Sequence, residues 1–221
     1  MAEPVRRRRS ETRANRARII DAAIGAFAAD PDASMDDVAR AAGVVRRTVY
    51  AHFPSREALV EGIVDEASAA IVASFGGGGP QPDRPDVAVA VLALLTWPIG
   101  DRFRMLLTFA RKELGEQRIL DLMEPARAPC IAIIERGQRD GTFSSYLPAA
   151  SLVAMTEAMT VTMLDQANKG AINDSGESMA IASLALVGVV PDRAAAVVDD
   201  AWAWIRDTAN AQAPGPAPDR R

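Results

Sequence analysis

Apolar residues recur at helical spacing along most of this 221-residue chain. Within residues 16–29, Ile20, Ala23, Ile24 and Phe27 follow one another at intervals of three or one residues, which places them on one side of an α-helix. Similar spacing predicts further helices over residues 87–97, 101–123, 125–140, 148–168, 176–189 and 192–208. No alternation of the kind typical of β-strands competes with this pattern. The pattern therefore predicts an all-α protein.

Shorter helical segments follow the first one closely. Ser34 and Asp37 have the spacing of a capping box at the start of a second helix, and Gly43 can take the left-handed conformation that ends it. A third helix is predicted from about residue 45 to residue 53, and Ser55 is placed to cap a fourth. A helix, a tight glycine turn and a second short helix make a helix-turn-helix pattern.

Two segments rich in glycine and proline separate the helical regions. The sequence GGGGPQPDRPD and the C-terminal APGPAPDRR cannot continue a helix and offer little apolar surface to bury. We therefore predict a basic, disordered arm over 1–15, a helix-turn-helix domain over 16–60 whose fourth helix continues to about 75, a flexible loop over 76–86, a larger helical domain over 87–210 and a disordered tail over 211–221.

The net charge of −4 conceals an asymmetry along the chain. Residues 1–60 carry 11 Arg against 8 Asp and Glu, a net charge of +3, whereas residues 61–221 have a net charge of −7. The first 18 residues alone carry +5. A basic block on an otherwise acidic protein indicates contact with a polyanion at one end, and nucleic acid is the first candidate. A basic tail without a fixed partner is the alternative.

Several classes of protein are disfavoured by the composition. A single cysteine, Cys130, and a single histidine, His52, provide neither an internal disulfide nor a metal site. Uncharged apolar stretches such as 87–100 and 178–190 are shorter than a membrane span requires, and no apolar run follows the N-terminal arginines as in a signal peptide. No paired carboxylates, phosphate-binding glycine loop or Ser/His/Asp arrangement is evident. We expect a cytoplasmic protein without membrane contact, metal, cofactor or enzyme activity.

The third predicted helix has an unusual outer face. On a helix, Val45, Val49 and Phe53 cluster on one side. The remaining surface carries no acidic residue and consists of Arg46, Arg47, Thr48, Tyr50 and Ala51. A helix that only covered a core would be expected to show mixed charges there. This face suits a DNA major groove, where arginine pairs with guanine and hydroxyl groups bind phosphates.

The segment SMDDVARAAGVVRRTVYAHFPSREALV resembles the signature of the tetracycline-repressor (TetR) family of bacterial transcription regulators, over about residues 13–64. Val45 departs from the pattern, because many members have a small polar residue there that can cap the third helix. Either that helix begins differently or its cap comes from elsewhere. For Tyr50 and His52, packing within the small domain is the alternative to DNA contact. The resemblance implies that the DNA contacts come from Ser34, Arg46, Arg47, Thr48, Tyr50, His52 and Arg56.

The same resemblance implies that residues 87–210 dimerise and bind a small effector, apolar or amphipathic in character. The last two predicted helices are apolar enough to form half of a two-fold, four-helix interface. Packing in the core or in the dimer interface is the alternative for the side chains that could line an effector pocket, and it is the favoured one for the methionines. Those side chains are Trp97, Phe103, Phe109, Met123, Met155, Met159 and Met163.

These inferences converge on a DNA-binding transcriptional regulator. We expect a homodimeric repressor that binds a palindromic double-stranded operator and is released from it by a small-molecule effector. The alternative is a helix-turn-helix activator or architectural factor that is controlled by a protein partner without a small ligand.

Overall fold

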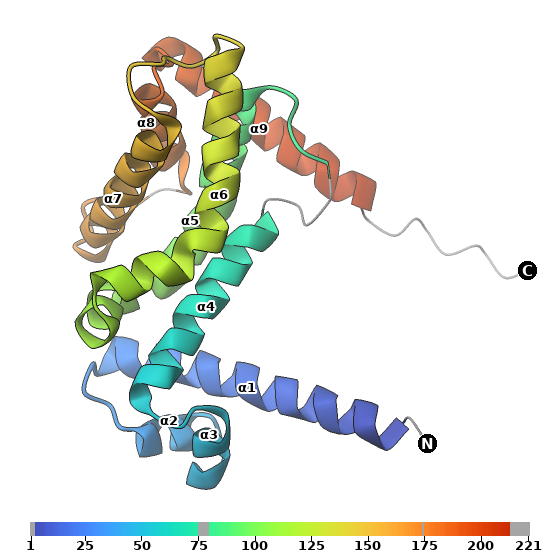
Figure 1. The fold of residues 1–221 in the computed structure, drawn as a ribbon, viewed down its shortest axis with the longest axis vertical. Helices are drawn as coiled ribbons and strands as arrows, with labels where there is room; N and C mark the ends of the chain where they lie inside the picture. Colours follow the sequence, from blue (N-terminus) through green and yellow to red (C-terminus); the bar gives the residue numbers. More distant parts are fainter. Residues whose placement is uncertain (1–2, 75–79, 174, 213–221) are drawn as a thin grey trace, which may run out of the picture. The chain divides into compact units, whose positions relative to one another are not determined.

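The computed structural model describes residues 3–74, 80–173 and 175–212. For residues 3–11, 104–109, 111, 116, 168 and 212, the structure describes the backbone but not the side chain. Within the described ranges the chain is all-α, as predicted, and no helix there has both the length and the apolar character needed to cross a membrane. The described helices (Figure 1) are α1 Glu3–Ala29, α2 Met35–Ala41, α3 Arg46–His52, α4 Arg56–Ser74, α5 Pro85–Leu114, α6 Glu116–Arg139, α7 Ala149–Asn168, α8 Glu177–Leu186 and α9 Pro191–Gln212.

The chain divides into two compact units. The first unit comprises Met1–Ala69 and Asp101–Pro125, and the second comprises Ala70–Gly100 and Ala126–Arg221. Helices α4, α5 and α6 contribute residues to both units. This division differs from the expected one, because the segment after residue 100 groups with the helix-turn-helix rather than with the larger helical region. The expected loop falls partly on residues 75–79, and the expected tail on residues 213–221, outside the described residues.

The core of the first unit is built on the predicted stripe of α1. Helix α2 packs against α1, and α3 packs against α2 on the same side of α1 (Figure 1). Ile24 is only half-buried, whereas the other members of the stripe are almost fully buried. The fully buried side chains of this core include Ile19, Ile20, Phe27, Val38, Val49 and Leu59.

Helix α1 begins much earlier than the sequence pattern indicated. It starts at Glu3, so the expected disordered arm over 1–15 is wrong for residues 3–15, which are helical. Arginine, alanine and glutamate are good helix formers and dominate this segment. Its proline, Pro4, stands in the first turn, where its missing N–H costs no helical hydrogen bond.

Two of the predicted helix boundaries are wrong, because the prolines next to them lie inside helices. Helix α5 continues through Pro98, and α6 continues through Pro125. The break between these helices is instead at Gly115, which has φ of +79°. A proline removes one backbone hydrogen bond but keeps a helical φ, whereas a left-handed glycine ends the helix. The predicted boundaries near 98 and 124 are therefore corrected to a single break at Gly115.

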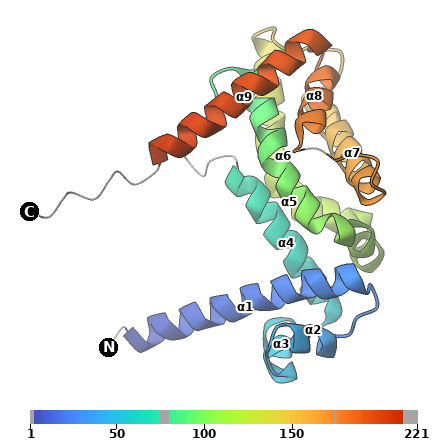
Figure 2. The same ribbon diagram turned by 180° about the vertical axis from the view of Figure 1, so that it is seen from behind.

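The second unit buries one face of each of its last two helices. Helix α8 packs against both α7 and α9 (Figure 2). Ile181 and Val190 keep exposed apolar surface. The apolar residues of the last two helices, from which an interface between two copies was expected, lie largely in the interior of the unit. The buried ones include Met179, Leu184, Val187, Val197 and Val198.

A buried carboxylate joins the start of α5 to α9. The Asp86 side chain is 1% exposed and receives two hydrogen bonds from Arg84, at 3.1 and 2.9 Å, and one from Arg193 at 3.0 Å. Arg84 also donates to Asp200 on α9 at 2.6 Å. Burial alone would raise the pKa of Asp86, but the hydrogen bonds from the two arginines outweigh it and hold this pKa below its usual range.

Replacing Gly62 by alanine is expected to destabilise the first unit. A β-carbon at Gly62 on α4 would lie 2.7 Å from Cε1 of Phe53, whereas one at Gly25 on α1 would meet nothing within 4 Å. Overpacking costs about 1–3 kcal/mol, and the better helix propensity of alanine returns about 1 kcal/mol. Gly62→Ala should therefore lower the free energy of unfolding in urea, and Gly25→Ala should raise it. Equal stabilisation by both would contradict the close packing.

Replacing Asp86 by asparagine should lower the unfolding free energy by about 2–3 kcal/mol near pH 7, because the Arg84 and Arg193 guanidinium groups lose the buried carboxylate that they share. Since the folded pKa lies below the unfolded value, the carboxylate stabilises the fold above about pH 4 and loses this effect as pH falls through the folded pKa. Denaturant unfolding at decreasing pH should show the gap between wild type and variant shrinking below about pH 4.

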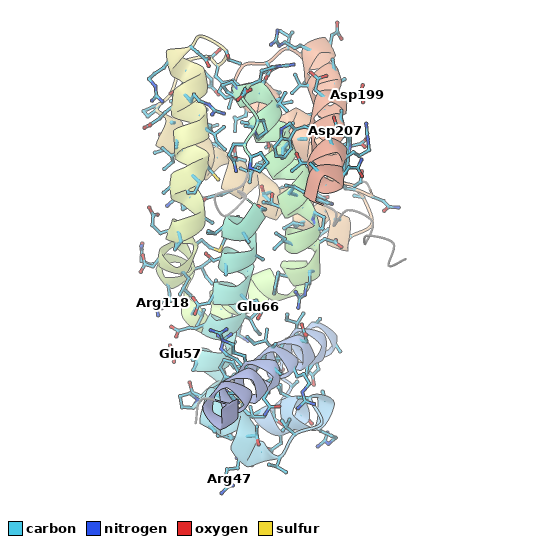
Figure 3. The ribbon with its side chains drawn as sticks, turned by 90° about the vertical axis from the view of Figure 1, so that its right-hand side faces the viewer. Arg47, Glu57, Glu66, Arg118, Asp199 and Asp207 are labelled. Atoms are coloured by element: carbon cyan, nitrogen blue, oxygen red, sulfur yellow. The ribbon has the colours of Figure 1, made fainter. Side chains whose placement is uncertain are left out.

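Asp199→Asn is the matched control, because Asp199 is an exposed carboxylate on α9, the helix that carries Arg193 (Figure 3). It should change stability by no more than about 0.5 kcal/mol. If the difference in unfolding free energy between wild type and Asp86→Asn stayed constant as the pH fell, the buried charge would not be the source of that difference.

Candidate functional site

The start of α2 is fixed by the capping box that the sequence predicts. The Ser34 hydroxyl accepts a hydrogen bond from the Asp37 N–H at 3.2 Å, and the Asp37 carboxylate accepts one from the Ser34 N–H at 2.9 Å. Hydrogen bonds from Ser34, supplemented by Arg40, lower the pKa of Asp37 to about 2, so this carboxylate stays ionised. Ser34 is exposed, and its hydroxyl orients the first turn of α2.

Helix α3 follows the glycine turn and is anchored by two buried side chains. Gly43 has φ of +65°, and Val49 and Phe53 are 0% and 3% exposed. Val45 was expected beside them, but it is 68% exposed. The reason is that Val45 is the N-cap, with extended backbone, so it precedes the helix and its side chain makes no capping hydrogen bond. The helix thus begins at Arg46 without a side-chain cap.

The two arginines on the outer face of α3 have different surroundings. Arg46 donates to a carboxylate oxygen of Asp36 at 2.7 Å and to the Tyr50 hydroxyl at 3.4 Å, and its guanidinium lies 5.1 Å from the centre of the Tyr50 ring. Arg47 makes no hydrogen bond or ion pair with the described residues, and its side chain points away from the ribbon (Figure 3). Sequence reasoning did not identify Asp36, which stands ten residues before its partner.

The remaining residues of this face provide hydroxyl and imidazole groups. Tyr50 is 38% exposed, and Thr48 and His52 are half-buried. The His52 ring lies beside that of Phe53, with 6.4 Å between ring centres. Arg46, Arg47, Thr48, Tyr50 and His52 therefore all come from the seven residues of α3, with Ser34 at the start of α2.

Arg56, at the start of α4, is held by partners outside α3. Its guanidinium stacks over the Phe27 ring at 4.5 Å and donates to the carbonyl oxygens of Pro31 and Ala33. Its Nε also lies 3.7 Å from a carboxylate oxygen of Glu113, and the side chain is 26% exposed. Arg56 therefore braces the connection between α1 and α2. Sequence spacing could not indicate this, because the partners are distant along the chain.

The residues suggested for an effector pocket are divided between the two units. Phe103 is buried and Met123 half-buried in the first unit, and the side chain of Phe109 lies outside the described residues. In the second unit, Trp97 is buried against Gly176. The three methionines lie along α7: Met155 is 44% exposed, and Met159 and Met163 are half-buried.

The second unit also contains a shallow, mainly apolar hollow of about 270 Å³ that the sequence did not suggest. Residues from the end of α4, from α5, α6 and α9 and from the segment 80–82 line it. Its larger side chains are Leu92, Leu95, Ile133, Trp204 and Ile205, none of which was expected to bind a ligand.

Residues 19–63 match the family model described as bacterial regulatory proteins, tetR family. The chain is 32% identical over 107 residues to TtgW of Pseudomonas putida, an uncharacterized HTH-type transcriptional regulator; the match covers 47% of this chain and 80% of that protein.

Two solved structures share the fold. The fatty acid degradation regulator FadR from Bacillus halodurans matches with a TM-score of 0.69 and 17% identity, over 78% of this chain and 94% of that one. The TetR-like regulator LfrR from Mycobacterium smegmatis, solved in complex with proflavine, matches with a TM-score of 0.62 and 19% identity, over 82% and 97%.

Proposed function

Because the chain belongs to the tetR family of bacterial regulatory proteins and is a transcriptional regulator, we propose that it acts as a homodimeric repressor. In this proposal α3 reads a palindromic operator, and a small-molecule effector releases the protein from it. Proteins of this family are regulators of transcription rather than enzymes, and we propose no catalytic role for any residue.

The observation that carries the DNA-binding proposal is the outer face of α3. Its buried side holds the helix in place, and its outer side presents an unpaired, outward-pointing Arg47 among the described residues, beside the Thr48 and Tyr50 hydroxyls. No acidic side chain belongs to this helix. Arginine recognises guanine with two hydrogen bonds in the major groove, and hydroxyl groups and imidazoles bind the flanking phosphates. We therefore assign base reading to Arg47 and backbone contacts to Thr48, Tyr50 and His52.

A dimer would give the operator its symmetry. A two-fold axis presents two copies of α3 at a fixed separation, so the half-sites should be inverted and about one helical turn of DNA, or a multiple of it, apart. The proposal places the dimer contact on the outer face of α8, where Ile181 is exposed, and on the outer face of α9, with the exposed Val190 directly before its first residue.

Control by an effector is supported by ligand complexes of proteins that share the fold. LfrR was solved with proflavine and RolR with resorcinol, and FadR from Bacillus subtilis with stearoyl-CoA. These ligands are apolar, aromatic or amphipathic, which agrees with the apolar and methionine-rich helices of the second unit. An effector can release the operator only if it prefers the conformer that does not bind DNA, and a tenfold preference corresponds to about 1.4 kcal/mol.

The repressor proposal is tested by footprinting the purified protein on the DNA upstream of its own gene. We expect protection of a palindrome, two protomers for each operator, and loss of protection with an effector that also raises the melting temperature. An effector that stabilises the protein but leaves the footprint unchanged would favour the alternative of control by a protein partner.

Arg47→Ala should weaken operator binding by about 10- to 100-fold and relax the base preference at one position of each half-site, because a bidentate contact to guanine is worth about 1–3 kcal/mol of discrimination. Titrations over operators with single base-pair changes measure both effects. Arg139→Ala is the control, since it removes an exposed arginine of the second unit and changes the net charge equally. Unchanged base preference in Arg47→Ala would refute the assignment.

A further inference from the structure

The ion pair between α2 and α3 separates the roles of the two adjacent arginines. We propose that Arg46 reads no base and instead neutralises Asp36 on the DNA-facing surface, so that base reading by arginine falls to Arg47 alone. This inference rests on the proposed function. It specifies the roles of residues on the recognition surface, which is the exposed surface of residues 34–50 on α2, the glycine turn and α3.

The contacts of Arg46 direct its guanidinium toward α2 and along its own helix. Asp36 accepts from Nη1 at 2.7 Å, and the Tyr50 hydroxyl lies 3.4 Å from Nη2. The Tyr50 ring lies one turn further along α3 and lies 5.1 Å from the guanidinium carbon, within the range of a cation–π interaction. Arg46 is thus held on two sides by groups of the protein, whereas its neighbour Arg47 has no such partner within the described part of the chain.

The negative charge of Asp36 would oppose DNA binding if Arg46 did not neutralise it. It occupies the first turn of α2, and its side chain is 47% exposed, so phosphates that approach the start of this helix meet a carboxylate. A like charge opposite a phosphate opposes binding, and the opposition grows as water is excluded from the interface. The guanidinium of Arg46, itself 64% exposed, cancels this charge at the surface.

A count of charges on the recognition surface leads to the same division. Asp37 is paired with Arg40 at 2.8 Å, and Asp36 with Arg46 at 2.7 Å. Two carboxylates and two guanidinium groups therefore cancel, and the remaining net charge of +1 is that of Arg47. The charged residues between positions 34 and 50 are Asp36, Asp37, Arg40, Arg46 and Arg47.

An exposed ion pair is weak, so a phosphate or a base could compete for Arg46. If Arg46 left Asp36 for a phosphate or a base, the negative charge of Asp36 would no longer be neutralised at the same surface. The repulsion between this carboxylate and DNA would offset the free energy gained from the new contact. Arg46 therefore affects how strongly the surface binds DNA and not which base it selects. It is a positioning residue for the α2–α3 surface.

The experiment measures operator affinity and base preference for wild type, Arg46→Ala, Arg46→Lys, Asp36→Asn and the double variant Asp36→Asn/Arg46→Ala. We expect Arg46→Ala to weaken binding by about fivefold to tenfold at every operator variant, with an unchanged base profile. The double variant should return to within about twofold of wild type, because both charges of the pair are gone. Arg46→Lys should retain both affinity and profile, since it keeps the charge but not the bidentate geometry.

Three results would overturn the inference: a lost preference at one operator position in Arg46→Ala, a double variant as weak as Arg46→Ala, or a changed profile in Arg46→Lys. Circular dichroism of each variant establishes that its total helix content is unchanged. Failure of the wild type to bind any operator specifically would overturn the proposed function together with this inference. Specific binding by wild type with a changed Arg46→Ala profile would overturn the inference alone.

Discussion

Everything on the recognition surface depends on the burial of two side chains beneath a very short helix. Seven residues cannot hold a helix in water, because nucleation costs more than so few hydrogen bonds return. Helix α3 therefore exists because Val49 and Phe53 are packed into the first unit. Gly62 on α4 makes room for the Phe53 ring, and Arg16 on α1 covers it at 5.4 Å from the ring centre. The outer face has a fixed orientation only as long as this packing holds.

Arginine has two separate uses in this protein. Arg56 and the pair Arg84 and Arg193 hold backbone carbonyls or a buried carboxylate, and they connect segments that are far apart in the sequence. Arg46 and Arg47 stand on an exposed helix, where only Arg46 has an acidic partner among the residues that the structure describes. The planar guanidinium suits both uses, because it can donate several hydrogen bonds and stack on an aromatic ring. Whether an arginine stabilises the fold or stays available for DNA depends on the acceptor groups that the fold places beside it.

Short motifs in the sequence predicted local structure well, but they did not predict contacts between residues that are far apart in the sequence. The capping box at Ser34, the turn at Gly43 and the buried pair on α3 all follow from spacing within a few residues. The role of Arg56 depends on carbonyl groups more than 20 residues away, so no pattern around it could reveal that role. The proposed pocket residues share an apolar character with the core, and periodicity alone cannot separate pocket from core.

The early start of α1 changes what its basic half can contribute to an encounter with DNA. A disordered arm would lose conformational freedom as its arginines settled along the phosphates, at a cost that reduces affinity. In a helix that already begins at Glu3, this backbone freedom is lost during folding, and the residues of the basic half, 3–18, rise by 1.5 Å each over about 24 Å of the helix axis. The positive end of the molecule is therefore a rod of fixed pitch, and its attraction for a polyanion carries a smaller entropic penalty than that of a free chain.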